Sequence, residues 1–236
     1  MNTTSNPYRG YRFPAAVISH CVWLYYRFAL SFRDVQELMA ERGVDVSHET
    51  IRAWCEKFGR LYAKRLRARR DRLGDRWHLD EVFLKINGRM QYLWRAVDQD
   101  GSVLDVLVQP KRDKRAAAKF FRKLLKGQAY APRVVVTDRF PSYRAPCAEL
   151  VSGATHVRDR HANNRAENSH LPTRLRERRM RRFKSSVHAQ RFLSIFGIVH
   201  DHFSVSRHAL SAMSRRDAWR RRLGQWCDIA GIASST

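Results

Sequence analysis

The pattern of residues 77–109 limits the possible folds of this chain more than any other feature. Three runs rich in β-branched and aromatic residues stand at 77–86, 90–98 and 103–109. Asn-Gly at 87–88 and Asp-Gly at 100–101 separate them. Because these dipeptides favour the tight turns of β-hairpins, the pattern predicts three consecutive antiparallel strands.

A helix and a fourth strand are expected next. The segment 112–126 has helical spacing, with Asp113 as its N-cap and Gly127 as its stop signal. The following run, 133–138, is short and continuously apolar, which is typical of a buried strand. Since a helix leads into it, this strand should lie parallel to an earlier strand. The chain is therefore expected to form an α/β domain with a mixed β-sheet.

Further elements are expected on both sides of these strands. A short strand is predicted at 155–159, a helical stretch from 163–164 to Arg182, and a last helical region from Ser186 onward. Before the sheet, residues 13–28 read as a helix that Pro14 opens.

Residues 31–59 contain a pair of helices joined by a short turn. Ser31 and Ser47 are suitable N-caps, and Gly43 lies between the two helical patterns. This arrangement predicts a helix-turn-helix, whose second helix normally enters the major groove of DNA. Its polar side carries three candidate DNA contacts: His48, Arg52 and Lys57. The alternative is that these are ordinary solvated side chains.

The charge of the chain favours a polyanionic partner. Lys and Arg number 46 and Asp and Glu number 22, so the net charge is 46 − 22 = +24. The basic residues are spread along the whole sequence, which fits a large nucleic-acid footprint better than a polybasic membrane anchor. No apolar run reaches the roughly 20 residues that a membrane span needs. The four cysteines lie far apart without a Cys-x-x-Cys pair, so we expect reduced cysteines and a cytoplasmic protein.

Three acids stand out by their positions. Asp80 lies in the first strand, Asp138 ends the apolar run 133–138, and Glu167 follows in a helical stretch. The spacings are 138 − 80 = 58 and 167 − 138 = 29 positions. Asp138 could alternatively be a turn residue, and Glu167 could close a capping box with Asn164. The neighbouring residue Glu81 competes with Asp80, because only one of two adjacent strand residues can face the same side.

The chain resembles a known family in both its order of elements and its motifs. The order resembles that of the RNase H-like fold, with one acid in the first strand, one after the fourth strand and one on a later helix. The motifs "YRFP", "SFRDVQELMAERGVDVSHETIRAW", "WHLDEVFLKINGRMQYLWRAVDQDG", "VVTDRFPSY" and "NNRAENSHLPTRLRERRMRRFKS" resemble those of the bacterial insertion-sequence transposases of the IS-six family. The family's acidic triad then corresponds to Asp80, Asp138 and Glu167. The interval between the last two is shorter here than in many members.

The resemblance implies an enzyme that binds terminal inverted repeats and cleaves and transfers DNA strands. Its expected cofactors are two Mg²⁺ or Mn²⁺ ions, bridged by Asp80, with Asp138 and Glu167 each completing one shell. Arg174, seven positions after Glu167, corresponds to a basic residue that contacts DNA near the cleaved end. The basic stretch around it should hold phosphates through Arg174, Arg178 and Arg181.

The resemblance also implies an assembly on DNA. Two element ends and a target duplex must be held together, so we expect a homo-oligomer, at least a dimer, associated with the nucleoid in the bacterial cytoplasm. Apolar residues outside the core are interface candidates: Trp23, Tyr25 and Phe28. A tyrosine recombinase is excluded because no Tyr follows Tyr143. The remaining alternative is a non-catalytic helix-turn-helix regulator.

We expect four parts in the chain. They are an arm and helix-turn-helix domain at 1–59, a basic connector at 60–74, an RNase H-like catalytic core at 75–185 and a helical C-terminal region at 186–236.

Overall fold

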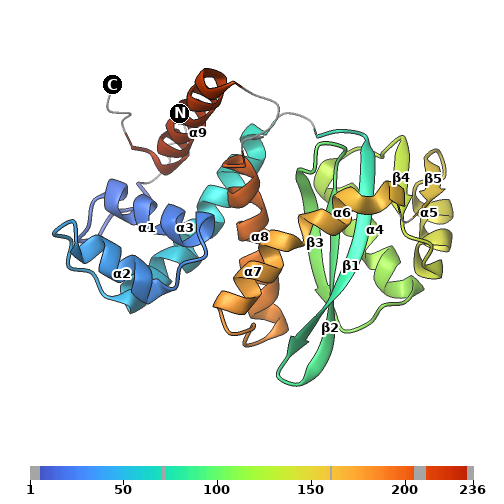
Figure 1. Cartoon of the computed structure of the whole chain (residues 1–236), viewed down its shortest axis with the longest axis horizontal. Helices are drawn as coiled ribbons and strands as arrows, with labels where there is room; N and C mark the ends of the chain where they lie inside the picture. Colours follow the sequence, from blue (N-terminus) through green and yellow to red (C-terminus); the bar gives the residue numbers. More distant parts are fainter. Residues whose placement is uncertain (1–5, 71–72, 160, 205–210, 233–236) are drawn as a thin grey trace. The chain divides into compact units, whose positions relative to one another are not determined.

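The computed structural model (Figure 1) describes residues 6–70, 73–159, 161–204 and 211–232. It divides into two compact units. The helical unit contains the chain up to Arg69 and from Ile198 onward, and the sheet unit extends from Arg70 to Gly197. The boundary predicted after residue 59 falls inside a helix, and the four-part division of the chain stays a prediction.

The sheet unit contains a five-stranded mixed sheet in the order β3-β2-β1-β4-β5. Its strands are β1 (Arg76–Ile86), β2 (Arg89–Val97), β3 (Val103–Gln109), β4 (Val134–Thr137) and β5 (Thr155–Arg158). The first three strands are antiparallel neighbours, whereas β4 is parallel to both β1 and β5. The three predicted hairpin strands and the parallel fourth strand are thus confirmed, and the topology is RNase H-like.

The turn between β1 and β2 shows why the sequence specifies this hairpin. Asn87 and Gly88 have φ of 49° and 76°. A two-residue hairpin turn of this kind requires positive φ at both central positions, which Asn and Gly tolerate best. A helix that contains Gln190 lies against β3, the outer strand of the sheet. The Gln190 side chain accepts a hydrogen bond from Val108 N at 2.8 Å and donates one to Val106 O, so backbone groups of this edge strand are satisfied.

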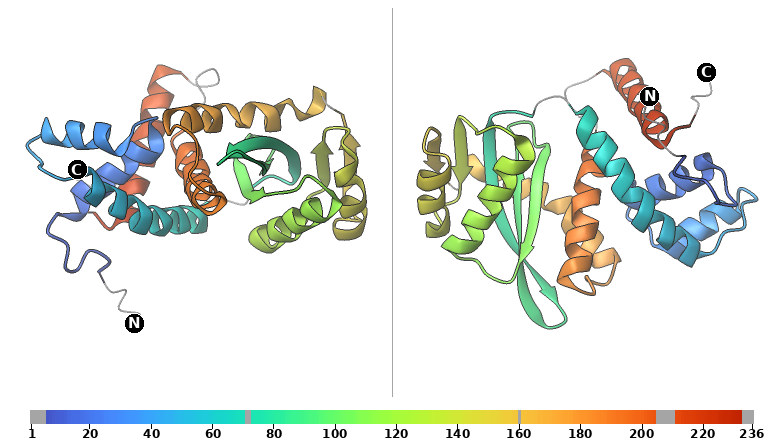
Figure 2. Two further views of the ribbon diagram at one scale, coloured as in Figure 1. Left: turned by 90° about the horizontal axis from the view of Figure 1, so that it is seen from below. Right: turned by 180° about the vertical axis from the view of Figure 1, so that it is seen from behind.

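Helices cover both faces of the sheet (Figure 2). On one face, α4 (Lys114–Gln128) and α5 (Arg144–Leu150) bury the main core. Trp77 and Leu79 of β1 pack there with Phe120 and Phe121 of α4. On the other face, α6 (Asn164–Ser169) packs against β1 and β2. It is followed by α7 (Leu171–Arg179) and α8 (Ser186–His202).

Two helix ends differ from the sequence prediction. Asp113 caps α4 as expected, since its side chain accepts from Ala116 N at 2.8 Å. However, α4 does not stop at Gly127 but continues to Gln128, and Ala129 takes the left-handed cap conformation with φ of 59°. The helical stretch predicted to continue to Arg182 divides at His170. Pro172 lacks the amide hydrogen that an unbroken helix would use there.

The helical unit contains α1 (Ala15–Arg27), α2 (Phe32–Ala40), α3 (His48–Arg69) and α9 (Ala212–Ala230). Ser31 forms a capping box with Asp34 at the start of α2, and Ser47 Oγ accepts from Thr50 N at the start of α3. Gly43, with φ of 72°, lies in the turn between the two helices. The predicted pair of helices is therefore present, and α3 continues without a break through most of the basic segment that was expected to end near Gly74.

The C-terminal helix belongs to the same unit as the first three helices. The α9 helix packs against α1 and α3, with the ring of Trp226 5.2 Å from that of Tyr62. The Tyr8 hydroxyl group joins the arm to this cluster by donating to Ala230 O at 2.6 Å. Along the described ranges, no helix is both long and apolar enough to cross a membrane.

Candidate active site

The pairing of β1 with β4 places Asp80 and Asp138 at the same level of the sheet. The paired residues Arg76–Val134 and His78–Val136 differ by 58 positions. The same offset separates Asp80 from Asp138, two positions beyond the last pair. Because parallel neighbours with one register stay level, this register leads Asp80 and Asp138, the residue after β4, toward the same end of the paired segment.

The environment of Tyr143 supports this placement. The Tyr143 side chain is fully buried. Burial raises the pKa of its hydroxyl group well above 10, and the charges of Glu81, Asp80 and Asp138 raise it further. Of these three carboxylates, Glu81 accepts a hydrogen bond from the Tyr143 hydroxyl group.

Asp80 and Glu81 point to opposite faces of the sheet. Asp80 lies opposite Arg95 of β2, and its Oδ2 is 3.3 Å from Nε2 of His170 at the α6–α7 junction. Glu81 has no exposed side-chain area, and it accepts hydrogen bonds from the Tyr143 hydroxyl group and from Arg112 Nε. Asp80 is therefore the acid on the face that α6 covers.

His170 is a buried neutral neighbour of Asp80. Burial lowers its pKa below 6.5, and the charges of Arg95 and Arg174 lower it further, whereas Asp80 raises it in part. A neutral imidazole can contact the carboxylate of Asp80 without cancelling its negative charge.

Asp138 combines a turn role with a place in the site. Its Oδ1 accepts from Phe140 N at 3.0 Å, so the turn interpretation holds. Its Oδ2 is also 3.7 Å from Arg112 Nη2. The guanidinium group of Arg112 lies 3.7 Å from the centre of the Phe140 ring. Arg112 thus stands between Glu81 and Asp138 and compensates both charges.

The carboxyl group of Glu81 has a raised pKa. Burial raises its pKa from 4.5 to about 7, although the hydrogen bond from Tyr143 and the charge of Arg112 lower it. The negative charge of Asp138 adds to the rise. Glu81 is thus a buried carboxyl group held by Tyr143 and Arg112.

Glu167 is on α6, the helix that packs over the Asp80 face, and it is exposed to solvent. The alternative capping box with Asn164 does not form, because the helix cap is Asn163, and its side chain makes no capping hydrogen bond. Instead, Asn163 Nδ2 donates to Leu79 O at 2.8 Å. This bond fixes the start of α6 against β1, one residue before Asp80.

The three acids do not form a closed metal cluster in this conformation. Within the residues that the structure describes, no three His, Cys, Asp or Glu side chains are arranged to hold a metal ion. Asp80 lies on β1 and Asp138 directly follows β4, whereas Glu167 is exposed to solvent on α6. The oxygen donors of this set nevertheless suit a hard divalent cation, which binds through a few carboxylates while it keeps several waters.

The candidate DNA contacts of the helical unit are on α3. His48 is fixed to α2, because its N and Nδ1 lie 2.9 and 3.1 Å from Gln36 Oε1. Arg52 is half-exposed and lies 3.2 Å from Glu49 Oε1. The Lys57 ammonium group lies 4.6 Å from the centre of the Tyr11 ring.

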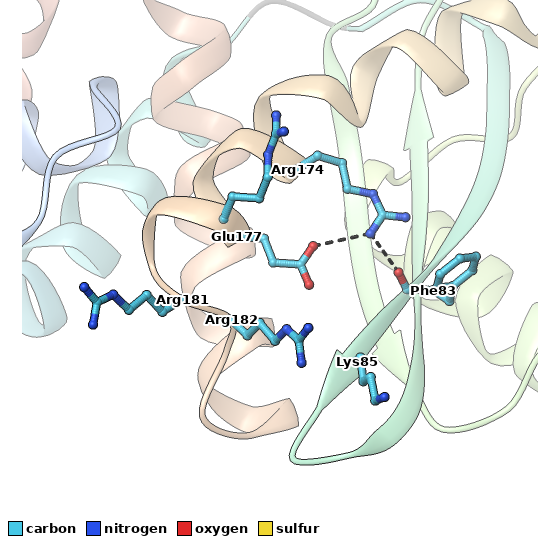
Figure 3. Close-up of a pocket in the computed structure, with 7 residues that line it drawn as sticks. Phe83, Lys85, Arg174, Glu177, Arg181 and Arg182 are labelled. Atoms are coloured by element: carbon cyan, nitrogen blue, oxygen red, sulfur yellow. Dashed lines mark hydrogen bonds and ion pairs between the residues drawn. The ribbon is translucent and has the colours of Figure 1, made fainter.

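The candidate contacts of the sheet unit border a basic hollow (Figure 3). Arg174 Nη1 donates to Phe83 O at 3.0 Å and lies 3.3 Å from Glu177 Oε2. Arg178 and Arg181 line the same hollow. Four further side chains contact these sites, and the sequence alone did not predict them because only the fold brings them there: Phe83, Arg112, Tyr143 and His170.

Comparisons with known proteins identify a family. A family model described as a DDE domain, of IS240-type transposases, matches residues 74–206. The transposase for the insertion sequence-like element IS431mec of Staphylococcus aureus (strain Mu50 / ATCC 700699) is 31% identical over 179 residues, which cover 74% of this chain and 80% of the relative. The transposase for insertion sequence element IS257 in transposon Tn4003 of Staphylococcus aureus matches with the same identity and coverage.

Solved structures with partial similarity include viral integrases. A chain of the simian T-cell lymphotropic virus intasome in complex with PP2A regulatory subunit B56 gamma matches 65% of this chain and 56% of its own length, with a TM-score of 0.47 and 17% identity. The HTLV-2 integrase catalytic core in complex with magnesium, in its trimeric form, matches 64% of this chain and 98% of its own length, with a TM-score of 0.39 and 16% identity.

Proposed function

Because the chain belongs to the IS-six family of insertion-sequence DDE transposases, we propose that Asp80, Asp138 and Glu167 are its catalytic acids. In this proposal the enzyme binds the terminal inverted repeats of its element and catalyses the cleavage and transfer of DNA strands. The observation that supports the proposal is the register of β1 against β4, whose paired residues differ by 58 positions, the same offset that separates Asp80 from Asp138 directly after β4.

The three carboxylates would hold the metal cofactor. Two Mg²⁺ or Mn²⁺ ions, when bound, activate a water molecule or a 3′-hydroxyl group and stabilise the leaving oxygen of a phosphodiester. Asp80 stands between the other two acids in this scheme, with Asp138 on the strand side and Glu167 on the helix side. Glu167 is exposed on a short helix, so its side chain must turn toward the aspartates.

The neighbouring side chains keep the two aspartates in place. Arg112 holds Asp138 while it balances the charge of Glu81. His170 contacts Asp80 and, being neutral, leaves its negative charge available. Asn163 attaches the start of α6, the helix that carries Glu167, to β1 at Leu79, the residue before Asp80. The chain thus orients its acids through buried polar contacts.

The basic side chains would bind DNA. Three residues in the first half of α3 are the candidates for reading the terminal repeat, as in a helix-turn-helix: His48, Arg52 and Lys57. Arg174, Arg178 and Arg181 are candidates for phosphate contacts near the site of cleavage. The net charge of +24 supports binding to both the element ends and the target duplex.

Transposition also requires two element ends, so the enzyme should act as a homo-oligomer of at least two chains. Of the three interface candidates, Tyr25 is buried and Phe28 is 42% exposed. The Trp23 ring packs edge-on against both Phe28 and Phe203. Phe28 is therefore the candidate that a second chain could reach. The enzyme would work on the nucleoid in the bacterial cytoplasm.

The test is a cleavage assay with a labelled terminal-repeat duplex. Purified protein should nick or join this DNA when Mg²⁺ or Mn²⁺ is added and should only bind it in EDTA. Binding without cleavage under every cation condition would favour the non-catalytic regulator.

A further inference from the structure

A second feature of the sheet unit is the hollow between the far half of β1 and the end of α7 (Figure 3). It has a volume of about 900 Å³. Five cationic side chains line it: Lys85, Arg174, Arg178, Arg181 and Arg182. Phe83 and Glu177 complete the lining, so the formal charge of the lining is 5 − 1 = +4.

Within the described part of the chain, only one of these five cationic side chains has an acidic partner. Arg174 pairs with Glu177. Among the described residues, no acidic side chain lies within 4 Å of the charged groups of Lys85, Arg178, Arg181 or Arg182. Clustered like charges repel each other unless an anion lies between them, so the hollow suits a ligand with more than one phosphate.

Phe83 adds an aromatic surface to the phosphate site. Its side chain is on a strand, yet 57% of it is exposed. Arg174 fixes this residue from two directions, since it donates to the backbone carbonyl group of Phe83 and its guanidinium carbon lies 5.4 Å from the ring centre. The ring is thus held in place by a cation while much of it stays open to solvent. An exposed aromatic ring among cations is the combination that binds unpaired nucleotides, where bases stack and phosphates pair with Lys or Arg.

The backbone after α7 directs side chains around the hollow. Arg181 and Arg182 have φ of 51° and 72°, and two consecutive left-handed residues other than glycine are uncommon. Their amide groups close the helix by donating to Arg178 O and Glu177 O. Arg182 consequently points across toward Lys85 on β1, whereas Arg181 points away from the other labelled side chains (Figure 3). Strain of this type often marks a ligand clamp.

The hollow is close to the proposed site of cleavage. Phe83 is three residues after Asp80 on β1, about 10 Å along the strand. This length matches roughly three nucleotides at the spacing of duplex DNA. Because strand side chains alternate, its ring faces the side of Glu81 rather than that of Asp80, and the hollow adjoins the proposed site along β1, where Arg174 donates to Phe83 O. A second copy of the chain is a poor occupant, because it would bring the same positive charge to the surface.

We infer that this hollow binds unpaired nucleotides of the DNA end next to the cut, with one base stacked on Phe83 and a phosphate between Lys85 and Arg182. The inference rests on the proposed function and specifies which part of the DNA substrate the sheet unit holds. It makes Phe83 a residue that recognises the opened end rather than the duplex.

The test compares two DNA ligands with the full-length chain in EDTA, so that no cleavage occurs. One is a blunt terminal-repeat duplex, and the other has the same duplex with three unpaired nucleotides that include 2-aminopurine. Phe83→Ala should weaken binding of the opened duplex by about 5- to 150-fold, the usual worth of one stacked base, and should leave the blunt duplex unchanged. Phe83→Trp should restore binding and quench the 2-aminopurine fluorescence.

Met90→Ala is the matched control, because Met90 is 48% exposed on the same hairpin but does not line the hollow. The inference is overturned if Phe83→Ala binds the opened duplex as the wild type does, if it weakens both duplexes equally, or if Met90→Ala shows the same loss. A failure of the proposed function would look different, because the wild-type protein would then show no preference for the repeat and no cleavage with Mg²⁺.

Discussion

The buried carboxyl group of Glu81 makes a specific prediction about stability and pH. Glu81 has no exposed side-chain area and lies between Tyr143 and Arg112. Its pKa rises to about 7 in the folded protein, mainly through burial, from 4.5. Glu81→Gln keeps the shape and an acceptor for the Tyr143 hydroxyl group but can never carry a negative charge.

The sign and size of the effect follow from this difference in pKa. Because the pKa of Glu81 is higher in the folded than in the unfolded chain, its favourable contribution is complete below pH 4.5 and is lost as the pH rises to about 7. The separation between 4.5 and about 7 corresponds to about 3 kcal/mol at 1.36 kcal/mol per pH unit. Near pH 4, where Glu81 is neutral, the variant and the wild type should have similar free energies of unfolding. Near pH 8 the variant should gain about 3 kcal/mol relative to the wild type.

Urea unfolding in EDTA at several pH values between about 4 and 8 measures this difference. The comparison of the two proteins at each pH cancels the titration of all groups that they share. A difference in unfolding free energy that stays constant over this range would refute the idea that Glu81 is desolvated. A difference that grows in favour of the wild type would show that Arg112 and Tyr143 outweigh the burial.

Three further predictions concern DNA binding and packing. Arg52→Ala should weaken binding to the terminal repeat, by about 1–3 kcal/mol with relaxed specificity if Arg52 reads a guanine; gel shifts on the repeat and on single-base variants measure both effects. Gly59→Ala should destabilise the helical unit by about 1–3 kcal/mol, because its new Cβ would lie 2.7 Å from Cε2 of buried Tyr26, and a thermal melt with an unchanged or higher midpoint would contradict this. Asn163→Ala should cost about 1–3 kcal/mol, since it leaves the buried carbonyl group of Leu79 without its partner; urea unfolding measures the loss, which should also reduce cleavage because α6 loses its attachment to β1.

The sequence predicts the sheet well because its signals are local. Asn87 and Gly88 force the hairpin turn whatever surrounds them, and Asp113 caps α4 through its own backbone neighbours. At two places the observed helices differ from the prediction. Gly127 remains inside α4, and Ala129 ends the helix although alanine rarely adopts positive φ. The helix breaks at His170 because Pro172 lacks an amide hydrogen. The surrounding residues favour a helix, so their composition alone predicts an unbroken one.

The site is predictable in part. The offset of 58 between Asp80 and Asp138 is visible in the sequence, but only the pairing of β1 with β4 gives it a structural meaning. Alternation along a strand shows that Asp80 and Glu81 face opposite sides, but the identity of the buried side depends on α4 and α6. His170 and Arg112 reach the acids only through the fold, and no local pattern marks either of them.

The most direct test of the catalytic assignment is the Asp138→Asn variant, with Asp100→Asn as its control. Asp138→Asn removes a formal charge from the proposed metal site while it nearly preserves shape, whereas Asp100 lies exposed in the turn between β2 and β3. Strand cleavage of the terminal-repeat duplex with Mg²⁺ should be lost in Asp138→Asn and retained in Asp100→Asn. Binding of the repeat should persist in both variants, and it should become tighter in Asp138→Asn because one negative charge near the phosphates is gone. If Asp138→Asn cuts the repeat as well as the wild type does, Asp138 is not a catalytic residue and the assignment of the three acids is wrong.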